Sequence, residues 1–366
     1  MRAIMQPDKM GSYAPEDVVF LLRDISNVKL ELNNEKRERL IQSGTHYSEM
    51  LPVEYQPSDA YMSLFYKTLD ASAERIALAV GIVAEQIVAR QGLENLVLVS
   101  LARAGTPIGV LIKRYIKMRY KVQVPHYTIS ILRGRGIDER AIQYIFAEHP
   151  SARIQFIDGW TGKGAITKEL QQACEHFNAN NEEQLDATLA VLADPGHCTS
   201  IYGTREDFLI PSACLNSTVS GLVSRTVLNL QFMKEDDFHG AKYYKELEDV
   251  DVSNLYIDSV STFFEQVQKD IEKHFSEQRP SPITWQGMNS VQVIQQELGI
   301  PNINFVKPGV GETTRVLLRR VPWKILINPK YVNELEHILL LAKEKNVPVE
   351  EYPNMSYACC GLIKEV

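Results

Sequence analysis

The segment RIQFIDGWTGKGAITKEL, residues 153–170, places an apolar run, one acid, a glycine-rich loop and a helix start in direct succession. The apolar run predicts a buried strand that ends at Asp158, and helical spacing begins at Ala165. A strand that passes through a glycine turn into a helix directs backbone N–H groups and the positive helix end to one point. Such a point favours an anion, so the segment predicts a phosphate site.

The side chains of this loop fit that chemistry. Gly162 and Gly164 let the backbone approach phosphate oxygens without an intervening Cβ atom. Thr161 offers a hydroxyl donor and Lys163 a positive charge. Asp158 would repel a phosphate, so it fits only if it accepts hydrogen bonds from sugar hydroxyls or faces a magnesium ion.

Two common phosphate loops do not match the spacing. A Walker A loop has four residues between its glycines and a Ser or Thr after its Lys. Here two residues separate Gly159 from Gly162, and Gly164 follows Lys163. The same glycines run in the wrong order for a dinucleotide-binding G-x-G-x-x-G loop. The remaining alternative is an ordinary strand-to-helix turn without a ligand.

A repeated strand–helix rhythm surrounds this loop. A long amphipathic helix is expected at 59–91, and the further strands are expected at 95–101, 124–132 and 187–194. Such alternation predicts an α/β fold with a parallel, doubly wound sheet, whose ligands bind at the carboxyl ends of the strands. The turns at those ends carry glycine or arginine; they cover 102–107, 132–138, 158–165 and 194–198.

Two of these turns add positive charge. Arg103 and the N–H groups around Gly105 predict a second anion site. Arg133 and Arg135 alternate with glycines on a loop that we expect to be mobile, although a solvated surface loop is the alternative. Two anion sites, a sugar-binding acid and a basic flap suit phosphoribosyl pyrophosphate (PRPP). Displacing its pyrophosphate requires positioning, charge neutralisation by Arg and Mg²⁺, and exclusion of water rather than a protein nucleophile.

Composition sets outer limits on the function. The 366 residues leave room for two domains, and 45% hydrophobic with 23% charged residues is ordinary for a soluble protein. The net charge of −7 argues against a basic surface overall but allows a local basic face. We expect no signal peptide and no membrane span. Five irregularly spaced cysteines suit the reducing cytoplasm, where we expect the protein to act.

Longer strings resemble known families. IQFIDGWTGKGAITKEL is similar to the PRPP-binding loop of type I phosphoribosyltransferases, and VSLARAGTPIGVLIKR resembles their pyrophosphate loop. Nearly the whole chain resembles a bacterial family found with tellurite and stress-resistance (Ter) operons and often labelled cysteine protease StiP. The strings that carry this second resemblance are RERLIQSGTHYSEMLP, LARAGTPIG, IDGWTGKGAI, DFLIPSACLNSTVSGLVSRTV and YACCGLIKEV.

The resemblance implies a phosphoribosyltransferase with a C-terminal Pelota-type RNA-binding domain, acting in a stress response. It implies PRPP and an unidentified base-like acceptor as substrates, and Mg²⁺ as the accompanying ion. Carried onto this chain, the catalytic residues are Asp158, Arg103, Arg133 and Arg135, with Asp158 facing the metal through ligand or water. The implied phosphate contacts are Ala104, Gly105, Thr106, Gly159, Thr161, Gly162, Lys163, Gly164 and Ala165. The family loop has two adjacent acids, whereas Gly159 takes the second place here and leaves the metal arrangement open.

Residues 201–230 are the candidate hood over the acceptor. The residues expected to bind the acceptor are Asp194, His197, Ser217 and Arg225. The alternative is that the many Ser and Thr side chains of this segment only satisfy backbone groups.

The boundaries expected from these patterns are 1–58 for an N-terminal extension, 59–280 for the phosphoribosyltransferase-like domain and 281–366 for the Pelota-like domain. In the last, the order helix, strand, helix, exposed strand and the turn at 309–315 resemble RNA-binding domains of the Pelota and kink-turn type. The residues expected to bind RNA are Gly311, Glu312, Arg315 and Arg319. A packing or dimerisation domain is the alternative, and a homo-oligomer is left open.

Phosphoribosyl transfer is thus the expected activity, and a nucleotide- or RNA-binding regulator on the same scaffold is the alternative. Proteolysis comes last, because neighbouring side chains on an extended segment, such as His197 and Cys198, point to opposite faces. A pairing of Cys214 with the distant His239 is left open.

Overall fold

A six-stranded sheet forms the centre of the protein. We describe a computed structural model, which covers residues 6–234, 236–277 and 282–365, so the expected boundary at 280/281 lies outside the described residues. Every strand pair of the sheet is parallel. In spatial order the strands are β1 (Val19–Phe20), β6 (His126–Ile129), β5 (Leu96–Leu101), β9 (Arg153–Trp160), β10 (Leu189–Ala193) and β11 (Ile201–Thr204). The predicted α/β class and large parallel sheet are confirmed.

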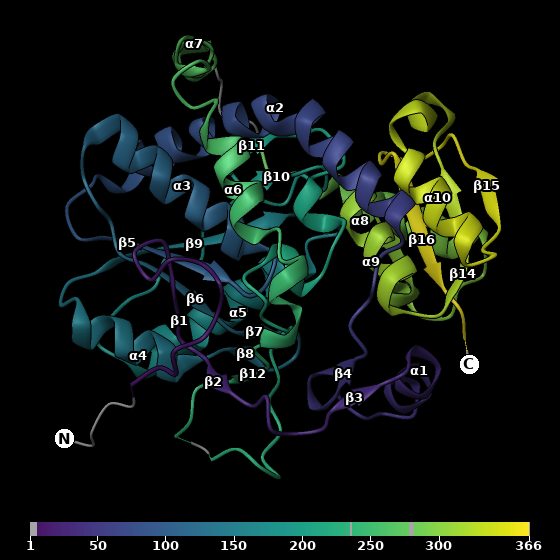
Figure 1. Ribbon diagram of the computed structural model, residues 1–366, viewed down its shortest axis with the longest axis horizontal. Coiled ribbons are helices and arrows are strands. Elements are labelled where there is room, and N and C mark those ends of the chain that lie inside the picture. Colours follow the sequence, from purple (N-terminus) through teal and green to yellow (C-terminus); the bar gives the residue numbers. More distant parts are fainter. Residues whose placement is uncertain (1–5, 235, 278–281, 366) are drawn as a thin grey trace.

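Helices cover both faces of this sheet (Figure 1). Leu96 and Leu98 of β5 point into one core layer, and the alternating Val97 and Val99 point into the other, as the two-residue period of a strand requires. The first layer includes residues from α2 (Asp59–Gln91), α3 (Gly105–Tyr120) and α6 (Ser253–Ser261). The second includes residues from α4 (Glu139–Glu148) and α5 (Ala165–Asn180). The helix predicted at 59–91 is confirmed in full.

The chain reverses its direction of travel across the sheet at β5. From β5 it crosses to β6 on one side, and it then returns through α4 to β9 on the other side. In open parallel sheets a ligand crevice opens at the carboxyl ends of two strands whose connections diverge in this way. The turns after β5 and β9 are therefore the places where the fold itself favours a site.

One strand is longer than its sequence predicts. β9 continues past Asp158 to Trp160, because Trp160 pairs with Ala193 of β10. Gly159 and Trp160 are thus the last strand residues and not part of the turn, which shortens the loop before α5 to 161–164.

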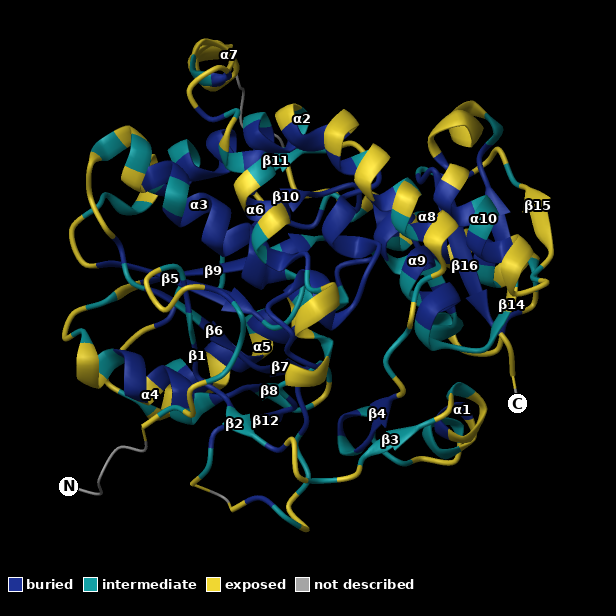
Figure 2. Cartoon of the chain, in the orientation of Figure 1, coloured by how far each residue is buried: buried dark blue, intermediate teal, exposed yellow. Residues whose placement is uncertain are grey.

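The C-terminal part has its own four-stranded sheet. Its strand order is β13 (Val306–Pro308), β16 (Cys359–Ile363), β14 (Pro322–Ile327) and β15 (Val349–Glu351), and only the pair β14–β15 is parallel. The helices that accompany this sheet are α8 (Gln286–Glu297), α9 (Val310–Arg319) and α10 (Glu336–Glu344). Figure 2 shows β15 exposed at the outer edge, which confirms the predicted exposed strand.

Short elements complete the architecture. The N-terminal residues supply β1 to the main sheet and place α1 (Asn34–Gln42) beside the C-terminal part (Figure 1). The short paired strands are β2 (Arg23–Asp24) with β12 (Gly240–Ala241), β3 (Glu31–Leu32) with β4 (Leu51–Pro52), and β7 (Ile131–Leu132) with β8 (Gly136–Ile137). The helix α7 (Gln268–Glu277) packs against α2. Within the described residues no helix has both the length and the apolar character needed to cross a membrane.

The start of α3 packs unusually closely on β9. A Cβ atom on Gly105 would lie 2.4 Å from the carbonyl oxygen of Ile157, which is backbone and cannot move aside cheaply. We predict that Gly105→Ala lowers the free energy of unfolding by about 1–3 kcal/mol, because overpacking strains the core. Thermal denaturation measures this change. Gly162→Ala is the matched control, since its Cβ would meet no atom closer than 3.4 Å. Equal stability of the two variants would contradict the close packing.

Candidate anion-binding site

A cavity of about 800 Å³ opens between the carboxyl end of β9, helix α1 and the C-terminal domain. Its walls carry a strong excess of positive charge, with eight Lys or Arg residues against three Asp or Glu residues. The cations are Arg37, Arg39, Arg133, Lys163, Arg225, Lys307, Arg315 and Arg320, and the acids are Asp158, Glu312 and Glu365. On a chain of net charge −7 this excess marks a local site for a negatively charged ligand.

The N-terminus of α5 forms part of the same wall. Gly164, Ala165, Ile166 and Thr167 all line the cavity. Gly164 precedes the helix with φ +81° and no side chain caps this end. The positive end of a 16-residue helix therefore adds its field to that of the surrounding cations.

The charged forms of several cations in the cavity wall are destabilised by burial and by neighbouring positive charge. Burial, followed by repulsion from Arg133, lowers the pKa of Lys163 to about 8. The same two causes hold the pKa of Lys307 well below its ordinary value. Burial and the neighbouring Arg37 lower the pKa of Arg225 to about 9. An anion placed among these groups would relieve the repulsion between them.

Two acids face the same space in different states. Burial raises the pKa of Asp158 to about 6, although Arg315 and the N–H of Gly159, 2.7 Å from Oδ1, favour its charged form. Burial acts on Glu312 in the same direction, but Arg315 and Lys307 hold the pKa of its carboxyl below the usual value. Arg315 donates to Glu312 at 2.6 Å. Glu312 thus neutralises part of the positive charge, while Asp158 changes its charge near neutral pH.

Many of the predicted site residues do meet at this cavity. The structure brings together Asp158, Arg133, Thr161, Gly162, Lys163, Gly164, Ala165, Arg225, Glu312 and Arg315. Among the described residues, those predicted for the site that do not line it are Arg103, Ala104, Gly105, Thr106, Arg135, Gly159, Asp194, His197, Ser217, Gly311 and Arg319. The contacts of the second group explain why.

The turn after β5 serves packing and not this cavity. Arg103 donates to the carbonyl oxygen of Val223 and to Oδ1 of Asn216, both at 3.3 Å, and lies beside a separate small cavity with Arg319. Gly105 is pressed against β9, and the Thr106 hydroxyl accepts from Thr128 at 3.1 Å. The predicted second anion site is therefore not formed at the main cavity.

The two arginines of the predicted flap have different roles. Arg133 reaches the cavity and donates to Oδ1 of Asn304 at 3.3 Å, which links it to the C-terminal domain. Arg135 forms an ion pair with Glu49 and donates to the carbonyl oxygen of Leu228 at 2.8 Å. Arg135 is thus anchored within the α/β part, contrary to the expectation of a mobile catalytic residue.

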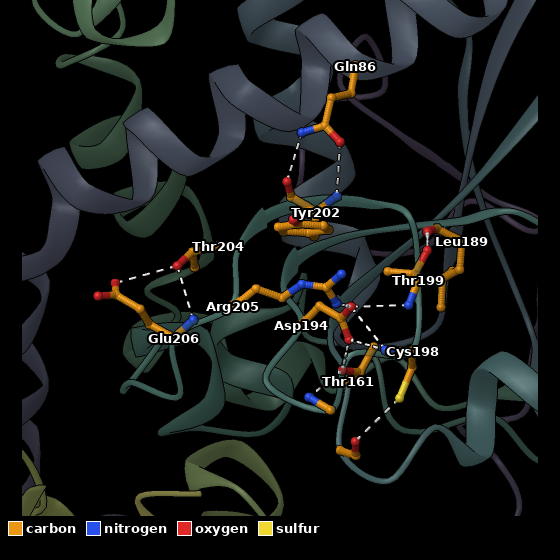
Figure 3. A network of polar contacts seen from close by, with 12 residues as sticks. Gln86, Thr161, Leu189, Asp194, Cys198, Thr199, Tyr202, Thr204, Arg205 and Glu206 are labelled. Atoms are coloured by element: carbon orange, nitrogen blue, oxygen red, sulfur yellow. Dashed lines mark hydrogen bonds and ion pairs between the residues drawn. The ribbon is translucent and has the colours of Figure 1, made fainter. Parts of the chain in front are cut away.

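Asp194 is the centre of an internal network (Figure 3). Its carboxylate accepts from the Thr161 hydroxyl, from Arg205, and from the backbone N–H groups of Cys198 and Thr199 at 2.9 Å and 3.1 Å. Since Asp194 is fully buried and its oxygens are occupied, it fixes the loop that follows β10. The expectation that Asp194 binds an acceptor is therefore wrong for this arrangement.

Two further acceptor candidates, His197 and Ser217, do not line the cavity. The backbone oxygen of His197 accepts from the N–H of Trp285 at 3.1 Å. The Ser217 hydroxyl and N–H both donate to Glu54 at 2.6 Å, away from the cavity. Of the four predicted acceptor residues, Arg225 alone lines the cavity.

The residues predicted for RNA face the α/β part. A Cβ atom on Gly311 would lie 2.4 Å from the Trp160 ring, so α9 approaches this ring as closely as a glycine allows. The Arg315 guanidinium lies 4.6 Å from the centre of the same ring. Arg319 donates to Asn216, next to the small cavity that contains Arg103. The side of the C-terminal domain that carries α9 therefore forms part of the wall of the main cavity.

Two of the cavity cations have no predicted role. Arg37 and Arg39 of α1 lie in the segment expected to be an N-terminal extension. The available signal was the basic run Lys36-Arg37-Glu38-Arg39, which by itself is typical of a solvated helix face.

The five cysteines are all buried and free. Burial raises the pKa of the Cys198 thiol to about 12, and its Sγ lies 3.7 Å from the carbonyl oxygen of Gly162 in the cavity wall. Burial likewise raises the pKa of Cys174 and Cys214 to about 12. The described residues contain no cluster of three or more His, Cys, Asp or Glu side chains able to hold a metal ion.

Comparison with known proteins identifies the family. Residues 11–261 match the family model described as tellurite-like stress resistance cysteine protease StiP. The chain belongs to the StiP family. It is 34% identical over 357 residues to the protein named cysteine protease StiP from Acinetobacter baylyi (strain ATCC 33305 / BD413 / ADP1), an alignment that covers 95% of this chain and 91% of that protein. Residues 285–365 match the model described as PELOTA RNA binding domain.

These matches correct the expected activity. Phosphoribosyl transfer is contradicted, because the StiP family and its Acinetobacter member both carry the name of a cysteine protease. Placing proteolysis last is contradicted by the same names. The geometry agrees in one respect, since the turn with Arg103 does not supply a second anion site to the main cavity. The resemblance to the StiP family and the C-terminal Pelota domain is confirmed.

The network around Asp194 yields a test of its structural role. We predict that Asp194→Ala lowers the free energy of unfolding by about 3–5 kcal/mol, because it removes a fully buried carboxylate that holds Thr161, two backbone N–H groups and the half-buried Arg205. Chemical denaturation measures this loss. Asp186→Ala is the control, since it breaks the exposed ion pair with Arg90 and should cost about 1 kcal/mol or less. A small loss for Asp194→Ala would contradict its structural role.

Proposed function

We propose that the protein binds a phosphate-bearing ligand of nucleotide size in the cavity between its two domains. The observation that carries this proposal is the ring of eight cations around the start of α5. The volume of about 800 Å³ lies within the range of small-molecule sites, which is about 300–1,000 Å³. Phosphate oxygens suit the planar donors of Arg133, Arg225 and Arg315. Binding would serve the stress resistance named for the family.

The lowered pKa values give this binding a second signature. Lys163 and Lys307 lose protons more readily than exposed lysines because they are buried among other cations. A bound phosphate stabilises their charged forms and so draws protons from solution. The heat of binding near pH 8 will therefore depend on the ionisation enthalpy of the buffer.

For the C-terminal domain we propose RNA as the partner. Its support is the Pelota model over 285–365 and the cations Lys307, Arg315, Arg319 and Arg320. Positive side chains of this kind bind the phosphate backbone without regard to sequence.

Titration calorimetry tests the cavity directly, with adenosine 5′-monophosphate (AMP) as probe and adenosine as the phosphate-free control. We predict that AMP binds while adenosine does not, and that Lys307→Met weakens AMP binding about tenfold or more through the loss of one buried charge. Lys67→Met is the matched control, because Lys67 is exposed in an ion pair with Glu336. Titrations with and without Mg²⁺ test whether the ion accompanies the ligand at Asp158. Equal binding of AMP and adenosine would contradict the proposal.

The same cations predict a pH dependence. Lys163 is protonated below its pKa of about 8 and neutral above it, so the cavity loses positive charge as the pH rises through that value. We expect AMP affinity to fall about threefold or more between about pH 7 and about pH 9.5. Lys163→Met should remove most of this decline. A constant wild-type affinity over that range would show that Lys163 does not interact with the phosphate.

Cysteine proteolysis, the activity named for the family, is the second candidate function. The observation that favours it is the position of Cys198 beneath the loop 162–164, which lines the cavity. Only the thiolate is an effective nucleophile, and burial holds the pKa of Cys198 at about 12. We propose that proteolysis would require the loop 162–164 to move, so that the thiol reaches solvent and an imidazole.

Hydrolysis of fluorescently labelled casein tests this candidate. If the chain is a thiol protease of this kind, Cys198→Ser abolishes hydrolysis, whereas Cys174→Ser leaves it intact because Cys174 lies on the buried face of α5, in the core. Alkylation by iodoacetamide should then modify Cys198 ahead of the other cysteines. Hydrolysis that survives Cys198→Ser, or none by the wild-type protein, would exclude Cys198 as the nucleophile.

A further inference from the structure

The C-terminal domain has one cationic face, made of Lys307, Arg315, Arg319 and Arg320. All four residues contact the α/β part or the cavity between the domains. Lys307 and Arg315 line that cavity, and Arg319 donates to Asn216. Arg320 forms an ion pair with Glu38 of α1 at 2.6 Å. The cationic face is therefore covered in this arrangement of the domains.

The other exposed charges of the domain do not offer a replacement. Its exposed lysines are Lys330, Lys343, Lys345 and Lys364, and its exposed acids are Glu297, Glu334, Glu336, Glu344, Glu350, Glu351 and Glu365. These residues mix both signs with an excess of acids. A polyanion would thus find its electrostatic partner on the cationic face.

Specific contacts hold the cationic face in place. The Asp207 carboxylate accepts from the N–H groups of Val310 at 2.9 Å and Ala358 at 2.8 Å, and so ties the start of α9 to the α/β part. The Tyr357 hydroxyl donates to the carbonyl oxygen of Gly162 at 3.1 Å. Lys163 donates to the carbonyl oxygens of Ile303 and Val306. These bonds cross between the domains and must break before the face is exposed.

We propose that RNA and domain docking compete for the cationic face. A folded RNA is far larger than a cavity of about 800 Å³, so its backbone reaches these four residues only when the C-terminal domain detaches. The docked arrangement is then autoinhibited toward RNA. This inference rests on the RNA partner proposed above, and it is independent of the nucleotide-sized ligand of the cavity.

The contact of Gly311 with Trp160 provides a way to open the domains. Because a Cβ atom at Gly311 already lies 2.4 Å from the ring, Gly311→Leu cannot be accommodated in the docked state. Gly311 is within α9, and leucine favours a helix, so the domain itself tolerates the change. A second route is the double variant Asp207→Ala with Glu38→Gln, which removes two tethers without changing the cationic face.

Fluorescence anisotropy with a labelled RNA stem-loop that contains an internal bulge tests the proposal in the full chain. We predict that both opening variants bind this RNA about tenfold or more tighter than the wild-type protein in about 150 mM salt. Adding Arg319→Gln and Arg320→Gln to the double variant should reverse the gain. Glu336→Gln is the control, because it breaks only the exposed interdomain pair with Lys67. Circular dichroism checks the fold, and small-angle X-ray scattering checks that the variants are extended.

Two results would overturn the proposal. Equal RNA affinity of wild-type protein and extended variants would show that docking does not cover the RNA-binding surface. No RNA binding by any form would also remove RNA as the partner of the C-terminal domain. In either case the AMP titrations decide the cavity ligand separately.

Discussion

The contact between Gly311 and the Trp160 ring brings the two halves of the site together. Trp160 ends the strand β9, whose carboxyl end the topology of the sheet already favours for a ligand. Because Gly311 lacks a Cβ atom, α9 can lie against the ring and place Arg315 over it. Lys307 and Glu312 then face Asp158 and the start of α5 across the cavity. Without this close approach the basic residues of the two domains would not enclose one cavity.

Crowding of positive charge is the cost of this arrangement. Burial and repulsion from neighbouring cations lower the pKa of Lys307, Arg319 and Arg225. The charged form of each group is therefore less stable here than in water. Glu312 and Glu38 offset only part of the charge. Repulsion between cations that serve only the fold would destabilise it without any gain, whereas a bound phosphate relieves the repulsion.

The sequence predicts the framework of this site well. Continuous apolar runs such as 95–101 identify buried parallel strands, and the glycine loop 161–164 does lie at the cavity. The sequence does not predict the role of a residue where that role depends on contacts with distant segments. The position of Asp194 at the end of a strand predicts a ligand-binding residue, yet its carboxylate accepts hydrogen bonds from Thr161 and Arg205. Arg103 likewise follows a strand but is turned toward Asn216.

The sequence also does not predict which residues from the two ends of the chain line the cavity. Nothing local in α1 indicates that Arg37 and Arg39 meet a cavity whose other cations lie far along the chain. The turn at 309–315 was recognised as part of an RNA-binding domain, but its partner surface, Trp160, can only be seen in the fold. The activity named for the StiP family has no counterpart in local sequence either, since no cysteine is paired with a histidine at a recognisable spacing.

The most direct test of the account is a crystal structure of the protein soaked with tungstate, a heavy analogue of phosphate. The account predicts an anomalous peak inside the cavity, between the N-terminus of α5 and the side chains of Arg133 and Lys307. It also predicts that Lys307→Met weakens or removes this peak. Peaks confined to the outer surface, with the cavity empty of tungstate in the wild-type protein, would contradict the central claim.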